Sequence, residues 1–498
     1  MFQFSVSGTE SIAAMNKMTN PAEIEAEFGP LYVAHQKVYP QSVAGRFRNV
    51  KWALMAVCLS VYYFLPFVRW DRGPNAPGQA VLIDFPNRRF YFFFIEIWPQ
   101  EVYYFTGLLI IAALALFLMN ALGGRIWCGY LCPQTVWTDL FYAVERLIEG
   151  DRRERIRKEK QPLSPRRVGE IVAKHSIWLF IAWWTGGAWV LYFADAPTLV
   201  RELATGQAPA VAYISIAILT FTTYSLAGFM REQVCVYMCP WPRIQAALTD
   251  EWALNVTYRY DRGEPRTSFK KAEELRARNL PAGDCVDCHQ CVAVCPTGID
   301  IRNGPQLGCI QCGLCIDACD AVMAKVHRPT RLIAYDTDEN LARRRRGEQN
   351  VYRLVRPRTI LYAALIVVTG CIMLYALVSR SSMNMSVLHL RAPLFTPTVE
   401  GGVRNGYTLR FSNETGEARD FTLNVTGLEG ARMTSVVARP LADGSLTAHI
   451  EPDTTLETPV YVATPPDATP GKSTPITFTA IDAHSGERKS VVDHFFAP

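Results

Sequence analysis

The chain has 498 residues, of which 49% are hydrophobic, 11% aromatic and only 19% charged, and its formal net charge is +5. This length accommodates two to four domains, and the composition is too apolar for an ordinary soluble protein, so membrane spans are expected. The small net charge argues against nucleic acid as a partner. The arginine run 343–346 is interpreted as a cytoplasmic flank of a membrane segment.

Five apolar stretches are each long enough to cross a bilayer as a helix. They run approximately over 52–69, 102–122, 174–194, 210–230 and 359–379. Residues 1–51 contain no apolar core of a cleavable signal peptide, so we expect the first stretch to be retained as a helix. That stretch is also the shortest, which leaves a re-entrant or interfacial segment as its alternative.

The distribution of basic residues predicts the orientation of these spans. Eleven Lys and Arg lie over 125–174, but only four over 69–101 and one over 195–210. By the positive-inside rule the first of these loops is cytoplasmic and the other two are periplasmic. We therefore expect a multi-pass protein with a cytoplasmic segment over 1–51, a four-helix membrane domain over 52–230, a cytoplasmic segment over 231–358, a fifth span over 359–379 and a periplasmic domain over 380–498.

An aromatic segment over 84–101 is expected at the outer membrane interface. An aromatic belt explains most of it. A quinol pocket built from Asp84, Arg89 or Glu96 is the alternative.

Two copies of a C-x-Y-x-C-P motif follow the second and fourth spans, offset by 107 residues. They contain Cys128 and Cys132 in the first copy, and Cys235 and Cys239 in the second. On a helix, positions i and i+4 share a face, and the proline that follows each pair should stop the helix there. Four thiols gathered at the cytoplasmic surface predict a Cu(I) site or a dithiol redox relay, because soft thiolates favour Cu(I). The alternative is that these cysteines only pack helix ends.

The other cysteine-rich segment predicts two [4Fe–4S] clusters in a ferredoxin-like α+β domain at about 275–330. Two C-x2-C-x2-C-x3-C runs follow one another, and in bacterial two-cluster ferredoxins the fourth cysteine of each run ligates the other cluster. One cluster is therefore expected on Cys285, Cys288, Cys291 and Cys319, and the other on Cys309, Cys312, Cys315 and Cys295. Zinc is the alternative metal, and this spacing fits its paired knuckles poorly. Cys58 and Cys371, alone in apolar stretches, are expected to be packing residues.

The C-terminal region changes from helical to strand-like patterning. About seven short segments with period-two alternation, such as 407–412 and 420–425, predict an all-β immunoglobulin-like sandwich. Its expected role is support or docking of a partner. Met383, Met385 and His389 lie just before these strands, where we expect a flexible linker, with weak Cu(I) binding as the alternative.

Several motifs, taken in order, resemble one known family. They are 89–93 (Arg-Phe-Tyr-Phe-Phe), 98–101 (Trp-Pro-Gln-Glu), 128–137, 235–243, the ferredoxin block and the C-terminal immunoglobulin-like domain. This combination resembles the cytochrome c oxidase accessory protein family, also called FixG, RdxA or CcoG, over nearly the whole chain. The ferredoxin block alone would be unspecific, because many redox proteins contain it.

The resemblance implies a protein of the bacterial inner membrane that helps assemble cbb-type haem-copper oxidases by reducing Cu(II) to Cu(I). Its implied partners are the lipid bilayer, copper chaperones or transporters and oxidase subunits, with the electron donor left open. The duplicated membrane half is also similar to NapH-type membrane ferredoxins, so quinol-linked electron transfer is an alternative. A non-enzymatic scaffold that docks oxidase subunits through the C-terminal domain is a third.

Overall fold

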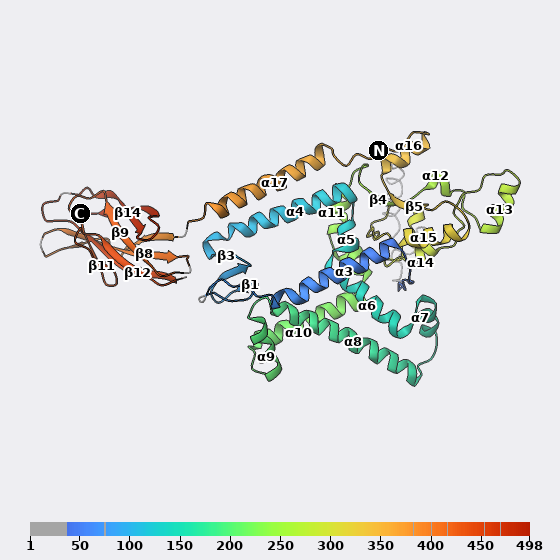
Figure 1. The fold of residues 1–498 in the computed structure, drawn as a ribbon, viewed down its shortest axis with the longest axis horizontal. Coiled ribbons are helices and arrows are strands. Elements are labelled where there is room, and N and C mark those ends of the chain that lie inside the picture. Colours follow the sequence, from blue (N-terminus) through green and yellow to red (C-terminus); the bar gives the residue numbers. More distant parts are fainter. Residues whose placement is uncertain are drawn as a thin grey trace, which may run out of the picture.

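The computed structural model describes residues 37–498, apart from 74–75, 382, 400, 416, 453 and 469. The protein is elongated, with three parts in a row (Figure 1). A β-sandwich formed by the C-terminal residues lies at one end, long helices occupy the middle, and a small mixed domain with β4, β5 and α12–α16 lies at the other end. The two compact domains are therefore separated by the helical part.

Four helical segments in the described chain are long and apolar enough to cross a membrane. They are α3 (Arg46–Phe64) with its continuation to Phe67, α4 (Tyr103–Gly123), α10 (Ala210–Ser225) with its continuation to Met230, and α17 (Pro357–Val378). The helix α8 (Pro165–Val190) contains most of the expected span 174–194 and packs against α10, but its tryptophans and Lys174 make it less apolar. The chain is thus a membrane protein, and the count of five spans stays a prediction.

Shorter elements connect these long helices. They are α5 (Ile126–Tyr130), α6 (Pro133–Glu149), α7 (Arg152–Glu159), α9 (Ala196–Thr205) and α11 (Trp241–Leu248). Within the aromatic segment 84–101 the structure has part of a three-stranded antiparallel sheet, β1 (Val81–Asp84), β2 (Arg89–Phe92) and β3 (Ile95–Ile97), which was not predicted. The chain reverses between β1 and β2 at Pro86-Asn87, where Asn87 N–H donates to Asp84 at 3.0 Å.

The mixed domain is closed by two strands that come from outside the cysteine-rich segment. β4 (Asn255–Tyr258) pairs with β5 (Ile333–Asp336) in antiparallel register, so residues 75 to 81 positions apart meet. Between them lie α12 (Tyr260–Gly263), α13 (Phe269–Ala277), α14 (Gln290–Ala293) and α15 (Leu314–Lys325), and α16 (Asp338–Arg345) follows. Its core combines cysteines with apolar side chains such as Val256, Ile316 and Met323.

The C-terminal domain is a sandwich of two five-stranded sheets, as the sequence predicted in outline. One sheet consists of β6 (Met383–His389), β7 (Thr396–Pro397), β8 (Val403–Asn413), β10 (Arg432–Ser435) and β13 (Thr454–Ala463). The other consists of β9 (Arg419–Thr426), β11 (Arg439–Pro440), β12 (Leu446–Ile450), β14 (Ser473–Asp482) and β15 (Arg488–Phe496). The flexible linker expected at Met383–His389 is wrong, because this segment is strand β6 paired with β8. Met383 and Met385 are 1% and 4% exposed in the sandwich core, so they pack rather than bind copper.

Two contacts fix the ends of the helical part. At the sandwich end Arg380, just after α17, bonds with Glu101 at 3.1 Å and lies 3.7 Å from Glu414 of the sandwich. At the other end Arg48 and Lys51 of α3 pair with Asp139 of α6 at 2.9 and 3.5 Å, and all three are buried. Along its length α17 packs on α4.

Candidate functional site

Both cysteine-rich loops adopt the same unusual backbone conformation. In the first loop Asp287 and His289 flank the middle cysteine with φ angles of 50° and 55°. In the second loop Gln311 and Gly313 flank it with φ angles of 55° and 73°. Residues other than glycine rarely adopt this left-handed conformation, and where they do the strain clusters at functional sites. The matching pairs mean that the two loops curl in the same way.

The four cysteines predicted for one cluster lie around a single cavity. Its thiol lining consists of Cys291, Cys295, Cys309, Cys312 and Cys315. Backbone N–H groups of Gln311 and Leu314 donate to the sulfurs of Cys309 and Cys312. Burial is the main reason why the pKa of Cys309 is raised to about 12, and the neighbouring Cys295 and Cys312 contribute to this rise. The loop therefore surrounds a small volume with sulfur atoms and N–H donors.

The other predicted quartet is also brought together, because α15 carries Cys319 back to the first loop. Burial is the main reason why the pKa of Cys319 is raised to about 12, and the nearby Cys291, Cys288 and Cys285 contribute to this rise. Three of the four side chains are buried, and Cys288 is exposed. The fourth cysteine of each run thus lies with the other loop, which is the arrangement that the spacing predicts for two clusters.

This donor set fits iron–sulfur clusters better than a single metal ion. Among the described residues, no three His, Cys, Asp or Glu side chains converge closely enough to hold one ion. Zinc would need four ligands, with thiolates at about 2.3 Å. A cubane instead uses a separate thiolate at each corner, so its ligands stand farther apart. Burial raises the pKa of Cys291 to about 12 and that of Cys315 strongly, so these thiols ionise near neutral pH only beside a bound cation.

Each C-x-Y-x-C-P motif ends a helix at its second cysteine, as the sequence predicted. In the first copy α5 ends, and Cys132 is the extended residue before α6, which begins with Pro133. In the second copy the π-helical turn Val234–Met238 ends at the extended Cys239. In both copies the N–H of the second cysteine donates to the carbonyl five residues earlier, at 2.9 and 2.8 Å. The repeat therefore extends to backbone hydrogen bonding.

The residue four positions before each motif also has a matching conformation. Gly124 and Arg231, 107 positions apart, have φ angles of 55° and 43°. A Cβ on Gly124 would collide with the side chains of Asn255 and Gln311 of the mixed domain, so only glycine fits there. Arg231 instead extends its guanidinium to the buried carboxylate of Glu145. The same backbone bend thus serves a close approach in one copy and an ion pair in the other.

The four thiols of the two motifs lie near one another. Burial is the main reason why the pKa of Cys128 and that of Cys235 are raised to about 12. The neighbouring thiols of Cys132 and Cys239 contribute to the rise at both residues, so each first cysteine lies near the second cysteine of both motifs. Cys128 Sγ donates to Gln245 Oε1 at 3.2 Å. The structure therefore gathers the four predicted cysteines without forming a three-ligand site for one ion.

The first motif packs directly on the second cysteine loop. A Cβ on Gly129 would lie 3.0 Å from Cys312 Cα and 2.7 Å from a carbonyl oxygen of the same loop, so the two backbones touch. The hydroxyl of Tyr130 donates to the carbonyl of Cys312 at 2.8 Å. Cys128 and Cys312 also belong to one buried apolar cluster. One pair of motif thiols therefore adjoins the loop that is predicted to hold a cluster.

Sequence reasoning missed the residues that join the membrane part to this loop. Arg125 was counted only as a positive charge, yet its guanidinium donates to the carbonyls of Leu307 at 2.6 Å and Pro242 at 2.9 Å. Its backbone N–H donates to Gln311 Oε1 at 2.7 Å. Gly129 carried a usable signal, because it is the small residue inside the first motif.

The remaining candidates lie away from the thiols. Arg89 pairs with Glu96 at 3.2 Å and lies over the ring of Trp98, so these charges are used within the small sheet. Cys58 is half-buried in α3, and Cys371 is exposed on α17. The expectation that Cys371 packs in a protein interior is therefore wrong.

Three segments match known protein families. Residues 230–338 match the family described as a 4Fe-4S dicluster domain, and residues 105–151 match a 4Fe-4S binding domain. Residues 373–498 match the family described as the IG-like fold at the C-terminal of FixG. The chain therefore carries iron–sulfur binding domains and an immunoglobulin-like domain. The cysteines of residues 105–151 are Cys128 and Cys132 alone, so a four-thiolate cluster there would need two more thiols from elsewhere in the chain.

Relatives of similar length share about half of their residues with this chain. Protein RdxB of Cereibacter sphaeroides is 51% identical over 82% of this chain and 85% of its own. Nitrogen fixation protein FixG of Rhizobium meliloti is 46% identical over 94% of both chains. Protein RdxA of Cereibacter sphaeroides is 49% identical over 81% of this chain and 85% of its own.

Proposed function

This chain belongs to the FixG/RdxA family of iron–sulfur proteins, and from that premise we propose that it reduces Cu(II) to Cu(I) for the assembly of a cbb-type cytochrome c oxidase. The observation that carries this proposal is the contact of Gly129 and Tyr130 with the loop of Cys312. It places a pair of thiols suited to copper beside a loop suited to a redox cluster. No ferredoxin-like domain alone would need such a contact.

The residues of this chain divide the work. Cys285, Cys288, Cys291 and Cys319 would hold one [4Fe–4S] cluster, and Cys295, Cys309, Cys312 and Cys315 the other. When bound, the clusters supply one-electron storage. Cys128, Cys132, Cys235 and Cys239 take the substrate copper ion, which gains one electron and becomes Cu(I). Because soft thiolates favour Cu(I), two of these sulfurs are enough to retain the product until a chaperone or the oxidase accepts it.

The two ends of the molecule are proposed to face different compartments. The cysteine-rich domain and the sandwich lie at opposite ends of the membrane helices (Figure 1). Together with the basic loop 125–174, this supports a cytoplasmic cysteine-rich domain and a periplasmic sandwich. The sandwich would then dock copper transporters, chaperones or oxidase subunits.

The test measures the reduction of Cu(II) by dithionite-reduced protein under anaerobic conditions, with stopped-flow absorbance as the readout. We expect wild type to reduce Cu(II), and the Cys128→Ser, Cys132→Ser, Cys235→Ser and Cys239→Ser quadruple variant to lose most of that rate while keeping its iron and sulfide. A Cys58→Ser, Cys371→Ser variant is the matched control. Equal rates in the wild type and the quadruple variant would contradict the proposal.

A further inference from the structure

A separate cavity lies between the first half of α8 and the π-helical turn Leu226–Met230 that follows α10. We call it the His175 cavity. Its lining includes Lys174, His175, Trp178, Phe229, Arg231 and Glu232. Gly228 and Phe229 belong to the last, π-helical turn of the candidate span Ala210–Met230. The cavity therefore lies at the boundary between membrane and water, and π-helical turns are frequent at functional sites.

Neighbouring cavities that share lining residues lead from the His175 cavity to the thiols of the second cysteine loop. The His175 cavity shares Arg231 and Glu232 with a second cavity, which is lined by Cys235. That second cavity shares Thr297 and Ile310 with the thiol-lined cavity of the second cysteine loop. Thr297 Oγ1 also lies 3.3 Å from the sulfur of Cys295, a predicted cluster ligand. Electrons released in the His175 cavity would therefore start in the cavity next to the one that Cys235, a motif thiol, lines.

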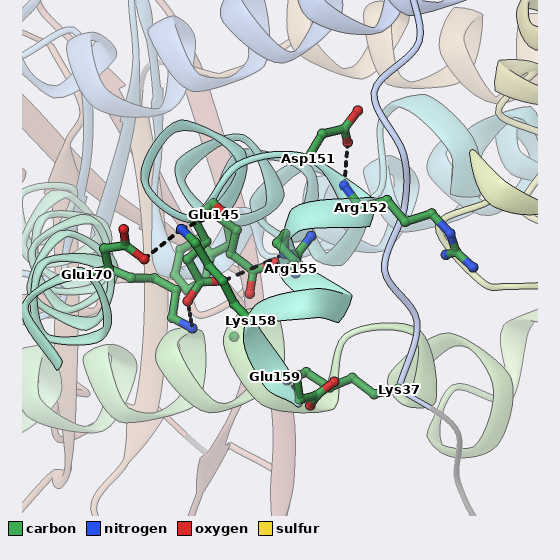
Figure 2. A network of polar contacts seen from close by, with 12 residues as sticks. Lys37, Glu145, Asp151, Arg152, Arg155, Lys158, Glu159 and Glu170 are labelled. Carbon is green, nitrogen blue, oxygen red and sulfur yellow. Dashed lines mark hydrogen bonds and ion pairs between the residues drawn. The ribbon is translucent and has the colours of Figure 1, made fainter. Parts of the chain in front are cut away.

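The charges around the His175 cavity are largely paired with one another. Figure 2 shows the adjoining network, in which Arg155 bonds with the lining residue Glu145, and Lys158 pairs with Glu170 at 2.7 Å beside a neighbouring cavity. Arg231 also bonds with Glu145, and Lys174 pairs with Glu149 at 2.7 Å. A ligand that entered with a net charge would have to break one of these buried pairs, which is costly. The cavity is therefore suited to a neutral ligand.

The uncharged part of the lining is aromatic and can donate hydrogen bonds. Trp178 is fully buried, and its ring centroid lies 6.3 Å from that of Phe229. His175 Nδ1 is hydrogen-bonded to the hydroxyl of Tyr224 at 2.9 Å, which leaves Nε2 as the ring nitrogen for a ligand. Its ring also stacks on Phe229 at a centroid distance of 5.9 Å. Aromatic walls with a few polar groups are typical of sites for planar small molecules.

We propose that the His175 cavity binds the head group of a membrane-dissolved quinol, which is the electron donor for the clusters. This inference rests on the proposed copper reduction only for the fate of the electrons. The quinol gives up two electrons and two protons and leaves as the quinone. One electron goes to each cluster, and the protons pass to His175 Nε2 and the carboxylate of Glu232 and then to water.

Binding is tested first, because it does not depend on turnover. Oxidised decylubiquinone is titrated into the full-length protein in detergent, and quenching of tryptophan fluorescence gives the Kd. Loss of one hydrogen bond and one ring should weaken binding about tenfold in His175→Leu, and Trp178→Phe should lower the quenching amplitude. His327→Leu, in the cysteine-rich domain, is the control and should leave the Kd unchanged. Equal Kd values for wild type and His175→Leu would overturn the proposal.

Electron transfer is tested next with decylubiquinol and the anaerobic protein, using the EPR signal of reduced clusters. Wild type should be reduced by the quinol, and His175→Leu should be reduced at least tenfold more slowly, although dithionite reduces both equally. Quinol that fails to reduce wild type would overturn the proposal. If dithionite-reduced protein fails to reduce Cu(II) but the quinol still binds and reduces the clusters, the copper function fails and this inference stands.

Discussion

The two C-x-Y-x-C-P motifs share a sequence pattern and a backbone path, but their surroundings differ. Tyr130 is 7% exposed and bonded to the loop of Cys312, whereas Tyr237, at the matching position of the second copy, is 74% exposed. Gly129 in the first copy corresponds to Val236 in the second. The duplication therefore places four cysteines at matching positions of the two motifs, and the residues between them differ in how closely they approach the loop of Cys312.

The largest effect is expected from the exchange of Arg231 for glycine, the residue that the first copy has at the matching position, Gly124. Arg231→Gly keeps the positive φ without strain but removes the buried ion pair with Glu145. We expect a loss of about 3 kcal/mol in the free energy of unfolding, because breaking a buried pair leaves an uncompensated charge. A thermal melt in detergent measures it. Adding Glu145→Gln to Arg231→Gly should recover part of the lost stability, because it removes the uncompensated charge. Equal melting temperatures for wild type and Arg231→Gly would instead show that Arg155 alone balances the charge of Glu145.

The reciprocal exchange inside the motifs should have a smaller and asymmetric effect. Gly129→Val gives the first copy the residue of the second, and its side chain would overlap the loop of Cys312. Overpacking of this kind costs about 1–3 kcal/mol, and we expect iron to be lost from the adjoining cluster. Val236→Gly should cost about 1 kcal/mol, mainly through the conformational entropy of the chain, and keep its iron, because the removal of a half-buried side chain creates no overlap with the cysteine loops. Iron and sulfide analysis distinguishes the two, and equal iron contents would contradict the contact.

Removal of one hydroxyl sharpens the comparison further. Tyr130→Phe loses the hydrogen bond to the carbonyl of Cys312, which should cost about 1 kcal/mol and slow the reduction of Cu(II) by the dithionite-reduced protein. Tyr237→Phe should change neither quantity, because Tyr237 is exposed. Stopped-flow rates and melting temperatures of both variants are the measurement. Equal slowing in both variants would mean that the copies do not differ in electron transfer.

The smallest effect is expected at the opposite end of the molecule, where neither motif reaches. Burial raises the pKa of Glu414 to about 7, against an ordinary value of 4.5, although Arg380 lowers it. Below pH 4.5 the carboxyl is protonated in both states, and between 4.5 and 7 the folded state binds more protons than the unfolded state. Stability should therefore fall as the pH rises through this range.

Glu414→Gln removes this titration. We expect its melting temperature to exceed that of wild type above pH 7 by about 1–2 °C and the difference to vanish near pH 4. Glu429→Gln, at an exposed position, is the control. Copper reduction should be the same in all three proteins, which separates this end from both motifs.

Much of the site could be predicted from spacing alone, because local geometry follows local sequence. The two cysteine runs and the 107-residue offset predicted which thiols lie near one another, since loop curvature and helix ends are set within a few residues. That these groups hold clusters or copper stays a prediction. The contact of Gly129 and Tyr130 with Cys312 could not be predicted. It joins segments about 180 positions apart and depends on tertiary packing, which leaves no periodic signal.

One error and one omission came from weighting composition above alternation. Residues 383–387 alternate two methionines and a valine with polar residues, which is a strand pattern, yet the position beside a span favoured a linker. Residues 95–97, Ile-Glu-Ile, alternate in the same way within β3, but the aromatic run drew attention to an interfacial belt, which stays a prediction, and the strand was not predicted. In both segments the burial that decides the structure comes from partner strands, such as β8 for residues 383–389.

The lateral packing of α17 has a consequence for biosynthesis. Along its length this helix packs on α4, which is made more than 230 residues earlier, and its other side chains are exposed apolar groups such as Ile372 and Val378. Its insertion therefore does not have to wait until the cysteine-rich domain has folded, although that domain is translated first. Loading of iron and folding of the C-terminal sandwich can then proceed in either order, so a completed chain can exist without its clusters.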